Sequence, residues 1–344
     1  MNNTIMWKEI FESGTAVKVC MEKNAEIVRA AVADFKSRKP AQIIFTARGT
    51  SDHASTYGKY LIETTTGIPV GLSACSVVTL YGAKMDYSNA CVIGVSQSGE
   101  GQDVYEVLAA AKAAGALTIS ITNEPESKIA KIADYHLCCS CGKEISVAAT
   151  KTFIMQLLLV TMFTAELSGK PELLNNIELA VIETLNRSEE VAALATRYRF
   201  MNECFVLSRG LGYPLALETA LKIQETCYVR ARAYPVSDFQ HGPFAMVENN
   251  TAVFMIAVDK ATDADVEHTI DRLNEVGADI YLVTNKPELF KKAATGVLLP
   301  DWCEGIPGLF AAAVCAQMFA STLSLSKGNN PDAPRGLAKV TITR

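Results

Sequence analysis

The chain has 344 residues, of which 49% are hydrophobic and 20% charged, a composition typical of a globular protein with a large core. Its net charge of −5, without a basic stripe, argues against nucleic acid as a partner. Lys8, Glu9 and Glu12 stand where a secretion signal needs apolar residues. Ten cysteines in such a chain predict reduced thiols and a cytoplasmic location. The length favours two domains.

Two apolar stretches, residues 153–163 and 309–325, are candidates for membrane-spanning helices. The first is too short to cross a bilayer, and Gln317 and Ser321 interrupt the second. Both therefore predict buried helices, and no membrane partner is expected.

His136, Cys138, Cys139 and Cys141 form the densest group of metal-ligand side chains. A metal site there would need a second ligand pair at a fixed spacing, and none is visible. Adjacent Cys138 and Cys139 would also point to opposite faces of a strand. The pattern favours the end of a strand, and we predict no metal.

The first half of the chain predicts an alternation of strands and helices. Residues 1–21 look irregular, and residues 24–36 have the apolar face of an amphipathic helix. Such alternation predicts an α/β fold with a doubly wound parallel sheet covered by helices on both faces. The expected strands are 43–47, 69–72, 91–95 and 117–121, and the expected helices are 54–65, 76–81 and 104–113.

The pattern returns about 161 residues later in the sequence. Arg48-Gly49 after the first strand is echoed by Arg209-Gly210, and Thr122-Asn123 by Thr284-Asn285. Two similar offsets at separate places predict two copies of one α/β unit. The predicted organisation is an N-terminal segment and helix (1–36), a first domain (37–169), a connecting helix (170–196), a second domain (197–328) and a tail (329–344).

The strand at 91–95 runs into Ser96, Gln97, Ser98 and Gly99, and a helix follows. Unpaired N–H groups at a helix start, with added hydroxyl and amide donors, suit a phosphate. The turn lacks the lysine of a Walker loop, and taken alone it is equally consistent with an ordinary connection. The second copy has residues 258–261 (VDKA) at this place, so we expect the first copy to bind the anion.

Three further stretches carry candidate acid–base residues. Glu218, Lys222 and Glu225 share one helical face, which is usually a solvated face, but the helix follows the Arg209-Gly210 turn, where α/β proteins bind ligands. His241 lies on a Gly-Pro loop, and Lys339 lies in the tail. A glutamate, a histidine and a lysine beside an anion site can move protons next to a carbonyl group.

Six blocks of sequence resemble the tandem sugar isomerase (SIS) domain family, in that family's order. The resemblance covers nearly the whole chain and extends to the isomerase half of glutamine–fructose-6-phosphate amidotransferases and to stand-alone glucosamine-6-phosphate deaminases. It implies two tandem SIS domains, each a three-layer αβα unit. The blocks are Gly49-Thr50-Ser51, Ser96 to Glu100, Glu144 to Lys151, Glu218 to Glu225, His241-Gly242-Pro243 and Arg335 to Lys339.

The resemblance also implies roles for particular residues. His241 would open the sugar ring, and Glu225, assisted by Lys222, would carry a proton between C1 and C2. Lys339 would close over the substrate and form a Schiff base with a ketose C2. No metal or organic cofactor is implied. A sugar 6-phosphate would be bound by Gly49, Thr50, Ser51, Ser96, Gln97, Ser98, Val147 and Ala338.

In the family the histidine comes from a neighbouring subunit, so the resemblance implies a homodimer in which His241 acts across the interface. The amidotransferases begin with a glutaminase domain and its N-terminal cysteine; this chain begins Met1-Asn2-Asn3, so we expect no release of ammonia from glutamine.

Three functions follow from the resemblance. The first is a phosphosugar isomerase and deaminase that converts glucosamine 6-phosphate to fructose 6-phosphate and ammonia. The second is a deglycase for a 6-phosphorylated fructosamine, or another ketose–aldose phosphate isomerase. The third is a regulator that binds a phosphosugar without catalysis, which would need the phosphate turn but not the acid–base residues.

Overall fold

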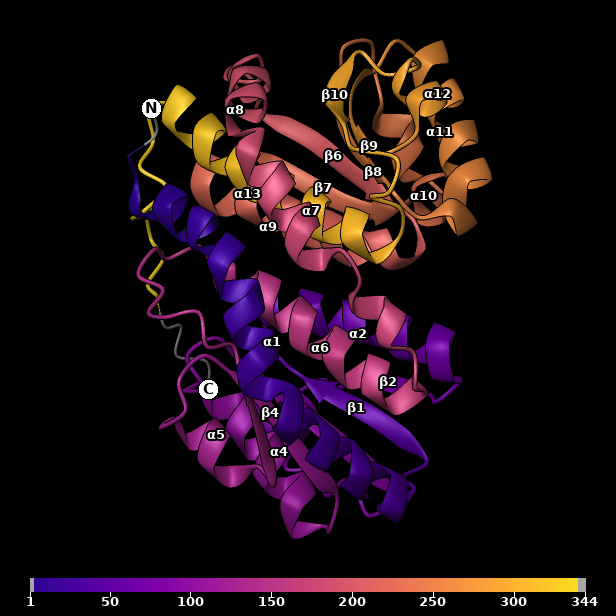
Figure 1. Ribbon diagram of the computed structural model, residues 1–344. Helices are drawn as coiled ribbons and strands as arrows, with labels where there is room; N and C mark the ends of the chain where they lie inside the picture. The colour runs from indigo at the N-terminus through magenta and orange to yellow at the C-terminus, as the bar shows by residue number, and fades with distance from the viewer. Residues whose placement is uncertain (1–2, 340–344) are drawn as a thin grey trace. The chain divides into compact units, whose positions relative to one another are not determined.

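The computed structural model describes residues 3–339 and contains two five-stranded parallel sheets, A and B (Figure 1). The chain divides into two compact units, each built on one sheet. Of the described residues, the sheet-A unit comprises Thr15–Ile145, Ala149–Asn175 and residues 338–339. The sheet-B unit comprises residues 3–14, Ser146–Ala148 and Asn176–Leu337.

Sheet A has the strand order β2-β1-β3-β4-β5, with all neighbours parallel. Every residue of its central strands β3 and β4 is buried, as expected where helices cover both faces of a sheet. The strands are β1 (Gln42–Thr46), β2 (Val70–Leu72), β3 (Ala90–Val95), β4 (Leu117–Thr122) and β5 (Tyr135–Cys138). The helices are α2 (Thr50–Thr66), α3 (Ser76–Thr79), α4 (Gln102–Ala113), α5 (Lys128–Ile132) and α6 (Lys151–Ser168).

Sheet B repeats this topology with the order β7-β6-β8-β9-β10, again all parallel. The shared order confirms the predicted duplication and the α/β class. The strands are β6 (Glu203–Ser208), β7 (Arg230–Pro235), β8 (Ala252–Ala257), β9 (Asp279–Thr284) and β10 (Thr295–Leu298). The helical segments are η2 (Gly210–Gly212), α9 (Tyr213–Cys227), α10 (Val236–Phe239), η3 (Pro243–Met246), η4 (Lys260–Thr262), α11 (Asp263–Glu275), α12 (Pro287–Phe290) and α13 (Ile306–Ser326).

The first helix is much longer than the sequence predicts. α1 runs from Ile5–Arg38, so the expectation of irregular structure over residues 1–21 is wrong from residue 5 onward. Its start is capped by the carboxylate of Asp332, which accepts hydrogen bonds from the backbone N–H groups of Ile5 (2.8 Å) and Met6 (2.7 Å). This cap comes from the far end of the chain and is invisible in the local sequence.

The predicted connecting helix of residues 170–196 is broken into three pieces. They are the 3₁₀ turn η1 (Pro171–Leu174) and the helices α7 (Ile177–Asn186) and α8 (Ser188–Thr196). Arg187 separates the two helices, and its guanidinium donates to the carbonyl of Leu298 at 2.6 Å and pairs with Glu190. The break between α7 and α8 therefore lies at a residue that contacts β10, and the local sequence gives no sign of this contact.

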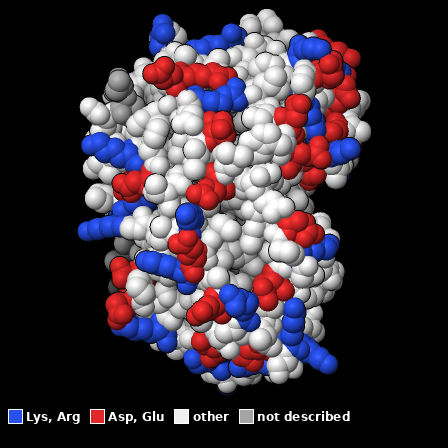
Figure 2. All heavy atoms as spheres, viewed as in Figure 1, with Lys and Arg blue, Asp and Glu red and all other residues white. Residues whose placement is uncertain are grey.

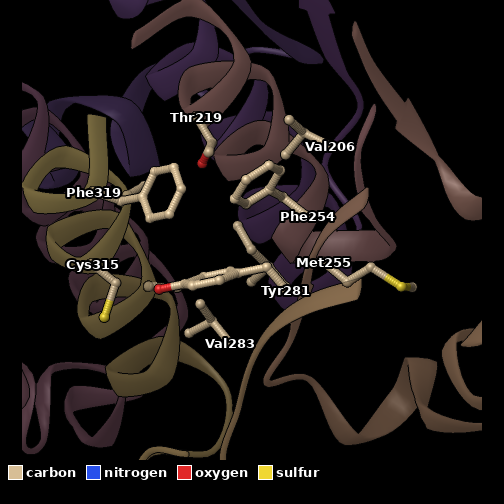
Figure 3. A pocket seen from close by; sticks show the side chains of 11 residues that line it. Val206, Thr219, Phe254, Met255, Tyr281, Val283, Cys315 and Phe319 are labelled. Carbon is tan, nitrogen blue, oxygen red and sulfur yellow. The ribbon is translucent and has the colours of Figure 1, made fainter. Parts of the chain in front are cut away.

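Both apolar stretches form buried helices, as predicted. α13 is long and apolar enough to cross a membrane, yet 83% of its most apolar window is buried within the protein. α9 and α13 cover sheet B and leave a cavity of about 20 Å³ beside β8 and β9, seen in Figure 3. The hydroxyl of Tyr281 has no hydrogen-bond partner in the described part of the chain, and its ring lines this cavity (Figure 3).

Charges of both signs are mixed on the surface. On the face shown in Figure 2, lysine and arginine side chains lie among aspartate and glutamate side chains. Several make ion pairs, such as Lys292 with Glu267 and Asp271. Exposed pairs of this kind contribute little to stability, and their value lies in solubility.

The ten cysteines are free thiols, nine of them buried. β5 ends at Cys138, as the strand-end interpretation predicted. Burial raises the pKa of these nine thiols above the ordinary value of 9.0, for example to about 11 for Cys303 and about 12 for Cys315. The folded protein therefore keeps these thiols protonated at a pH at which the unfolded chain ionises them.

The free energy of unfolding is accordingly expected to fall as the pH rises above about 9. Each buried thiol contributes up to about 1.4 kcal/mol per pH unit between its unfolded and its folded pKa, because the unfolded state binds fewer protons there. Urea unfolding at pH 7.5 and 9.5 under reducing conditions measures the slope, and Cys315→Ala should reduce it. Equal stability at the two pH values would contradict this prediction.

Candidate functional site

The carboxyl end of sheet A brings two predicted binding turns together. Strands β1 and β3 are parallel neighbours, with Thr46 opposite Gly94, so the turns that follow them leave the same edge of the sheet. The chain passes from β1 to β2 on one side and returns to β3 on the other. The crevice at such a reversal is where open α/β sheets bind ligands.

The turn after β3 presents hydroxyl donors. Ser96 Oγ accepts a hydrogen bond from the N–H of Gly99 (3.1 Å), and Ser98 Oγ accepts one from the N–H of Glu100 (3.3 Å). Because each oxygen is used as an acceptor within the turn, each hydroxyl retains its own hydrogen for a ligand. Helix α4 begins directly afterwards at Gln102, and its amino end favours negative charge. The turn can therefore bind an anion.

Gly99 gives the sharpest test of this turn. Its φ is +67°, and an added Cβ would lie 2.0 Å from Ser127 Oγ, so Gly99→Ala must distort the turn. We expect the dissociation constant for fructose 6-phosphate, measured by calorimetry, to rise at least about tenfold. Gly101→Ala is the matched control, because its φ is negative and its nearest new contact is an ordinary 3.7 Å. Equal affinities of the two variants would contradict the assignment.

The turn after β1 contains Gly49, Thr50 and Ser51. Gly49 has a φ of +53°, and Thr50 and Ser51 begin α2. Gln156 of α6 is fully buried and donates from Nε2 to Ser51 Oγ at 3.0 Å, which fixes that hydroxyl. Sequence reasoning missed Gln156, although it stands as a polar residue within the apolar run of residues 153–163. Arg48 Nε lies 2.5 Å from Asp103 Oδ2 and ties this turn to the first turn of α4.

Glu144 organises the start of α6. Its carboxylate is fully buried and accepts from the N–H groups of Thr150 (2.9 Å) and Thr152 (3.1 Å) and from Thr152 Oγ1 (2.8 Å). Lys339 Nζ lies 3.0 Å from Glu144 Oε2. Half-buried Val147 lies on the loop that leads from Glu144 to α6, and Ala338 is exposed.

The corresponding turn of sheet B is built differently, as the sequence predicted. After β8 the chain forms the turn η4, and the carboxylate of Asp259 accepts from the N–H of Ala261 at 3.1 Å. Asp259 Oδ2 also faces the turn after β6, since an added Cβ on Gly210 would lie 3.4 Å from it. A carboxylate at this crevice repels a phosphate, so the two copies have different tasks.

Helix α9 carries a buried ionic group. Lys222 is fully buried, and its Nζ lies 2.5 Å from Glu225 Oε2 and 3.4 Å from Glu218 Oε1. Desolvation alone would lower the pKa of Lys222, but the two carboxylates outweigh it and the pKa is raised above its usual range. The interpretation as a solvated helix face is therefore wrong, because Glu218 is also buried and only Glu225, with a side chain 20% exposed, reaches the surface.

Glu225 lies near the end of α9, far from the Arg209-Gly210 turn that was expected to bring it to a ligand site. Glu225 lies twelve positions after Tyr213, the first residue of α9, which corresponds to roughly 18 Å along the helix axis. The turn after β6 therefore does not place Glu225 at the carboxyl edge of sheet B. What marks Glu225 as a candidate is its contact with a buried lysine.

His241 lies on a separate element of the sheet-B unit. It follows α10, and its backbone N–H donates to the carbonyl of Asp238 at 3.0 Å. The residue is exposed, and among residues 3–339 no hydrogen bond or ion pair joins its ring to α9. Gly242 after it has a φ of +138°, a conformation that favours glycine.

The predicted site residues thus fall into two groups. The sheet-A unit holds Gly49, Thr50, Ser51, Ser96, Gln97, Ser98, Ala338 and Lys339, and the sheet-B unit holds Val147, Lys222, Glu225 and His241. Within the sheet-A unit the structure joins the two binding turns, and it places Lys339 at the start of α6 through Glu144. Within the sheet-B unit it joins Lys222 to Glu225 and leaves His241 apart.

Comparison with known proteins gives a consistent result. A model of the SIS domain matches residues 36–165 and 201–290. The glutamine–fructose-6-phosphate aminotransferase (isomerizing) of Aquifex aeolicus is 33% identical over 349 residues, covering 98% of this chain and 57% of that protein. The enzyme of that name from Pyrococcus horikoshii is also 33% identical, with the same coverage. The chain therefore spans a little over half the length of these relatives.

Solved structures resemble the chain over almost its whole length. A protein from Silicibacter pomeroyi assigned as a phosphosugar isomerase is 27% identical, with a TM-score of 0.80 over 96% of this chain and 100% of that one. Glucosamine-6-phosphate deaminase from Thermotoga maritima has a TM-score of 0.77 over 99% of this chain and 100% of that one, at 22% identity, which shows a shared fold.

Proposed function

Because this chain belongs to the SIS domain family, we propose that it is a cytoplasmic phosphosugar isomerase and deaminase that converts glucosamine 6-phosphate to fructose 6-phosphate and ammonia. The observation that carries the proposal is the Lys222–Glu225 contact, in which a fully buried ammonium group holds a carboxylate that remains 20% exposed. In this proposal the pair is a positioned proton carrier, and the turn after β3, with the hydroxyl groups of Ser96 and Ser98, binds the phosphate. A regulator that only binds its ligand would need the phosphate-binding turn but not the Lys222–Glu225 pair.

The proposed reaction requires an isomerisation with two proton movements and one hydrolysis. In the open-chain sugar, Glu225 takes the proton from C2 and returns a proton to C1. The C1 oxygen gains a proton and the amine nitrogen loses one, so the C1 aldehyde becomes an alcohol and C2 carries an imine. Water adds to that imine, and its oxygen becomes the C2 ketone as ammonia leaves. Lys222 holds Glu225 in place through its 2.5 Å contact, and His241 would open the sugar ring beforehand.

The experiment is an assay of ammonia release from purified protein with glucosamine 6-phosphate, run in parallel with an N-substituted fructosamine 6-phosphate. Release from glucosamine 6-phosphate, with stoichiometric fructose 6-phosphate, is the expected result. Amine release from the fructosamine alone would overturn the proposal in favour of a deglycase. Thermal stabilisation by fructose 6-phosphate without turnover of either compound would overturn it in favour of a regulator.

We also propose that the active form is a homodimer in which His241 serves the site of the second copy. The exposed position of His241, apart from α9, supports this arrangement. Mixing two inactive variants, Glu225→Gln and His241→Asn, through a cycle of dissociation and reassociation should then restore up to about a quarter of the wild-type activity, because mixed dimers contain one intact site. A mixture with no more activity than the separate Glu225→Gln and His241→Asn variants would contradict a site built from both copies.

A further inference from the structure

The tail that carries Lys339 is anchored before it reaches this residue. Asp332 caps α1, and the guanidinium of Arg335 lies 4.1 Å from the centre of the Tyr228 ring, whose hydroxyl accepts from the Arg335 N–H at 2.9 Å. Four residues later, the Lys339 amine meets Glu144 in the sheet-A unit. The side chain of Lys339 is 24% exposed, so it remains accessible to a ligand.

The two oxygens of Glu144 have separate tasks. Oε1 accepts from the backbone N–H groups of Thr150 and Thr152 and thereby caps α6. Oε2 accepts from Thr152 Oγ1 at 2.8 Å and from Lys339 Nζ at 3.0 Å. Because the Glu144 side chain is fully buried, water does not screen its attraction for the amine. The capping task does not require the lysine, so the contact with the tail is an additional feature.

The same end of α6 contacts the turn after β1, which contains Gly49, Thr50 and Ser51. Gln156, which donates to Ser51 Oγ, lies four residues beyond Thr152, roughly 6 Å along the helix axis. One helix start therefore receives the tail amine and fixes a hydroxyl of the predicted phosphate site. An amine at this place is suitably positioned for a phosphosugar bound at the turn.

We propose that Glu144 is a positioning residue for Lys339: its buried carboxylate docks the tail amine at the amino end of α6, the helix that also fixes Ser51 at the start of α2. The inference rests on the proposed function in one respect, that Lys339 contacts the bound sugar phosphate during the reaction. A lysine with such a role gains from a fixed starting position, and residues 329–339 of the tail form no regular secondary structure that could provide one.

The test of docking uses ligand-free protein and does not depend on activity. Lysines are acetylated with a small anhydride, and the rate at each residue is followed by mass spectrometry. In the wild type, Lys339 should react at least about fivefold more slowly than exposed Lys84, because an amine held by a carboxylate is a poor nucleophile. Glu144→Gln should raise the Lys339 rate towards that of Lys84. Thr152→Val, which removes one hydrogen bond of the same oxygen but keeps the charge, should change it by less than about twofold.

The second arm asks whether docking serves the reaction. With glucosamine 6-phosphate, Glu144→Gln should lower kcat at least about tenfold while KM changes by less than about threefold, and Glu144→Asp should restore part of kcat. Equal labelling of Lys339 and Lys84 in the wild type overturns the proposal, even where Glu144→Gln does not fold. Faster labelling in Glu144→Gln with unchanged kcat overturns it too. If the wild type does not turn over glucosamine 6-phosphate but Lys339 is labelled slowly, the proposed function is overturned, together with the role of the Glu144–Lys339 contact in the reaction. The docking of Lys339 on Glu144 is then still supported.

Discussion

Glu225→Gln is expected to lower kcat for glucosamine 6-phosphate by about 10²- to 10⁴-fold, the loss typical when a general acid–base group is removed. The amide cannot take a proton from carbon, but its oxygen can still accept from Lys222 Nζ, and Glu218 still balances the lysine charge. The variant should therefore fold normally. Ammonia release under saturating substrate measures the effect.

Two controls separate chemistry from binding and folding. The affinity of Glu225→Gln for fructose 6-phosphate should stay within about threefold of the wild type, since the turn proposed to bind the phosphate belongs to the sheet-A unit. Glu275→Gln, an exposed glutamate at the end of α11, should leave kcat unchanged. A Glu225→Gln variant that retains more than about a tenth of the wild-type kcat would assign the proton transfer to another group.

Lys222→Met is expected to lower the free energy of unfolding of the sheet-B unit by about 3–5 kcal/mol. Methionine fills nearly the same volume, but the buried carboxylate of Glu218 then loses its counter-ion. Both tryptophans of the chain, Trp7 and Trp302, belong to this unit, so their fluorescence in urea reports its unfolding. The double variant Glu218→Gln, Lys222→Met should recover more than half of the loss, because no buried charge is then left unpaired.

The same pair of variants distinguishes a buried ionic group from a solvated helix face. Were Lys222 exposed to water, its replacement would cost less than about 1 kcal/mol and Glu218→Gln would add nothing. That result would contradict the burial on which the catalytic assignment of Glu225 depends.

The sheet architecture was predictable because each strand is marked by nearby residues in the sequence, and because the same pattern occurs in both halves of the chain. Apolar runs such as residues 91–95 mark buried parallel strands, and the echo of Arg48-Gly49 in Arg209-Gly210 marks the duplication. The strand, turn and helix start of residues 91–102 were equally readable, because the hydroxyl and glycine residues of the turn are contiguous, and phosphate binding there stays a prediction. Its counterpart in the second copy lacks those residues, and the structure places Asp259 there.

What the sequence could not show depends on partners that are distant along the chain. The start of α1 is capped by Asp332, 327 residues away from Ile5. Thr4 also caps it locally, because its Oγ1 accepts from the N–H of Trp7 at 3.2 Å, and this was the one helix-start signal that sequence reasoning missed. The spacing of Glu218, Lys222 and Glu225 is the same for a solvated face and a buried group, and only packing against α13 and sheet B decides between them. Glu144 stood within a recognised motif, but its contact with Lys339 spans 195 residues.

In the proposed mechanism, Glu225 moves a proton from C2 to C1 of an amino-sugar phosphate. Glucosamine 6-phosphate deuterated at C2 tests it directly when the product is examined by NMR. Part of the deuterium should appear at C1 of the fructose 6-phosphate formed, turnover should be slowed by a primary isotope effect, and Glu225→Gln should form the product about 10²- to 10⁴-fold more slowly. Release of ammonia at the same rate from the deuterated and the ordinary substrate, undiminished in Glu225→Gln, would contradict it.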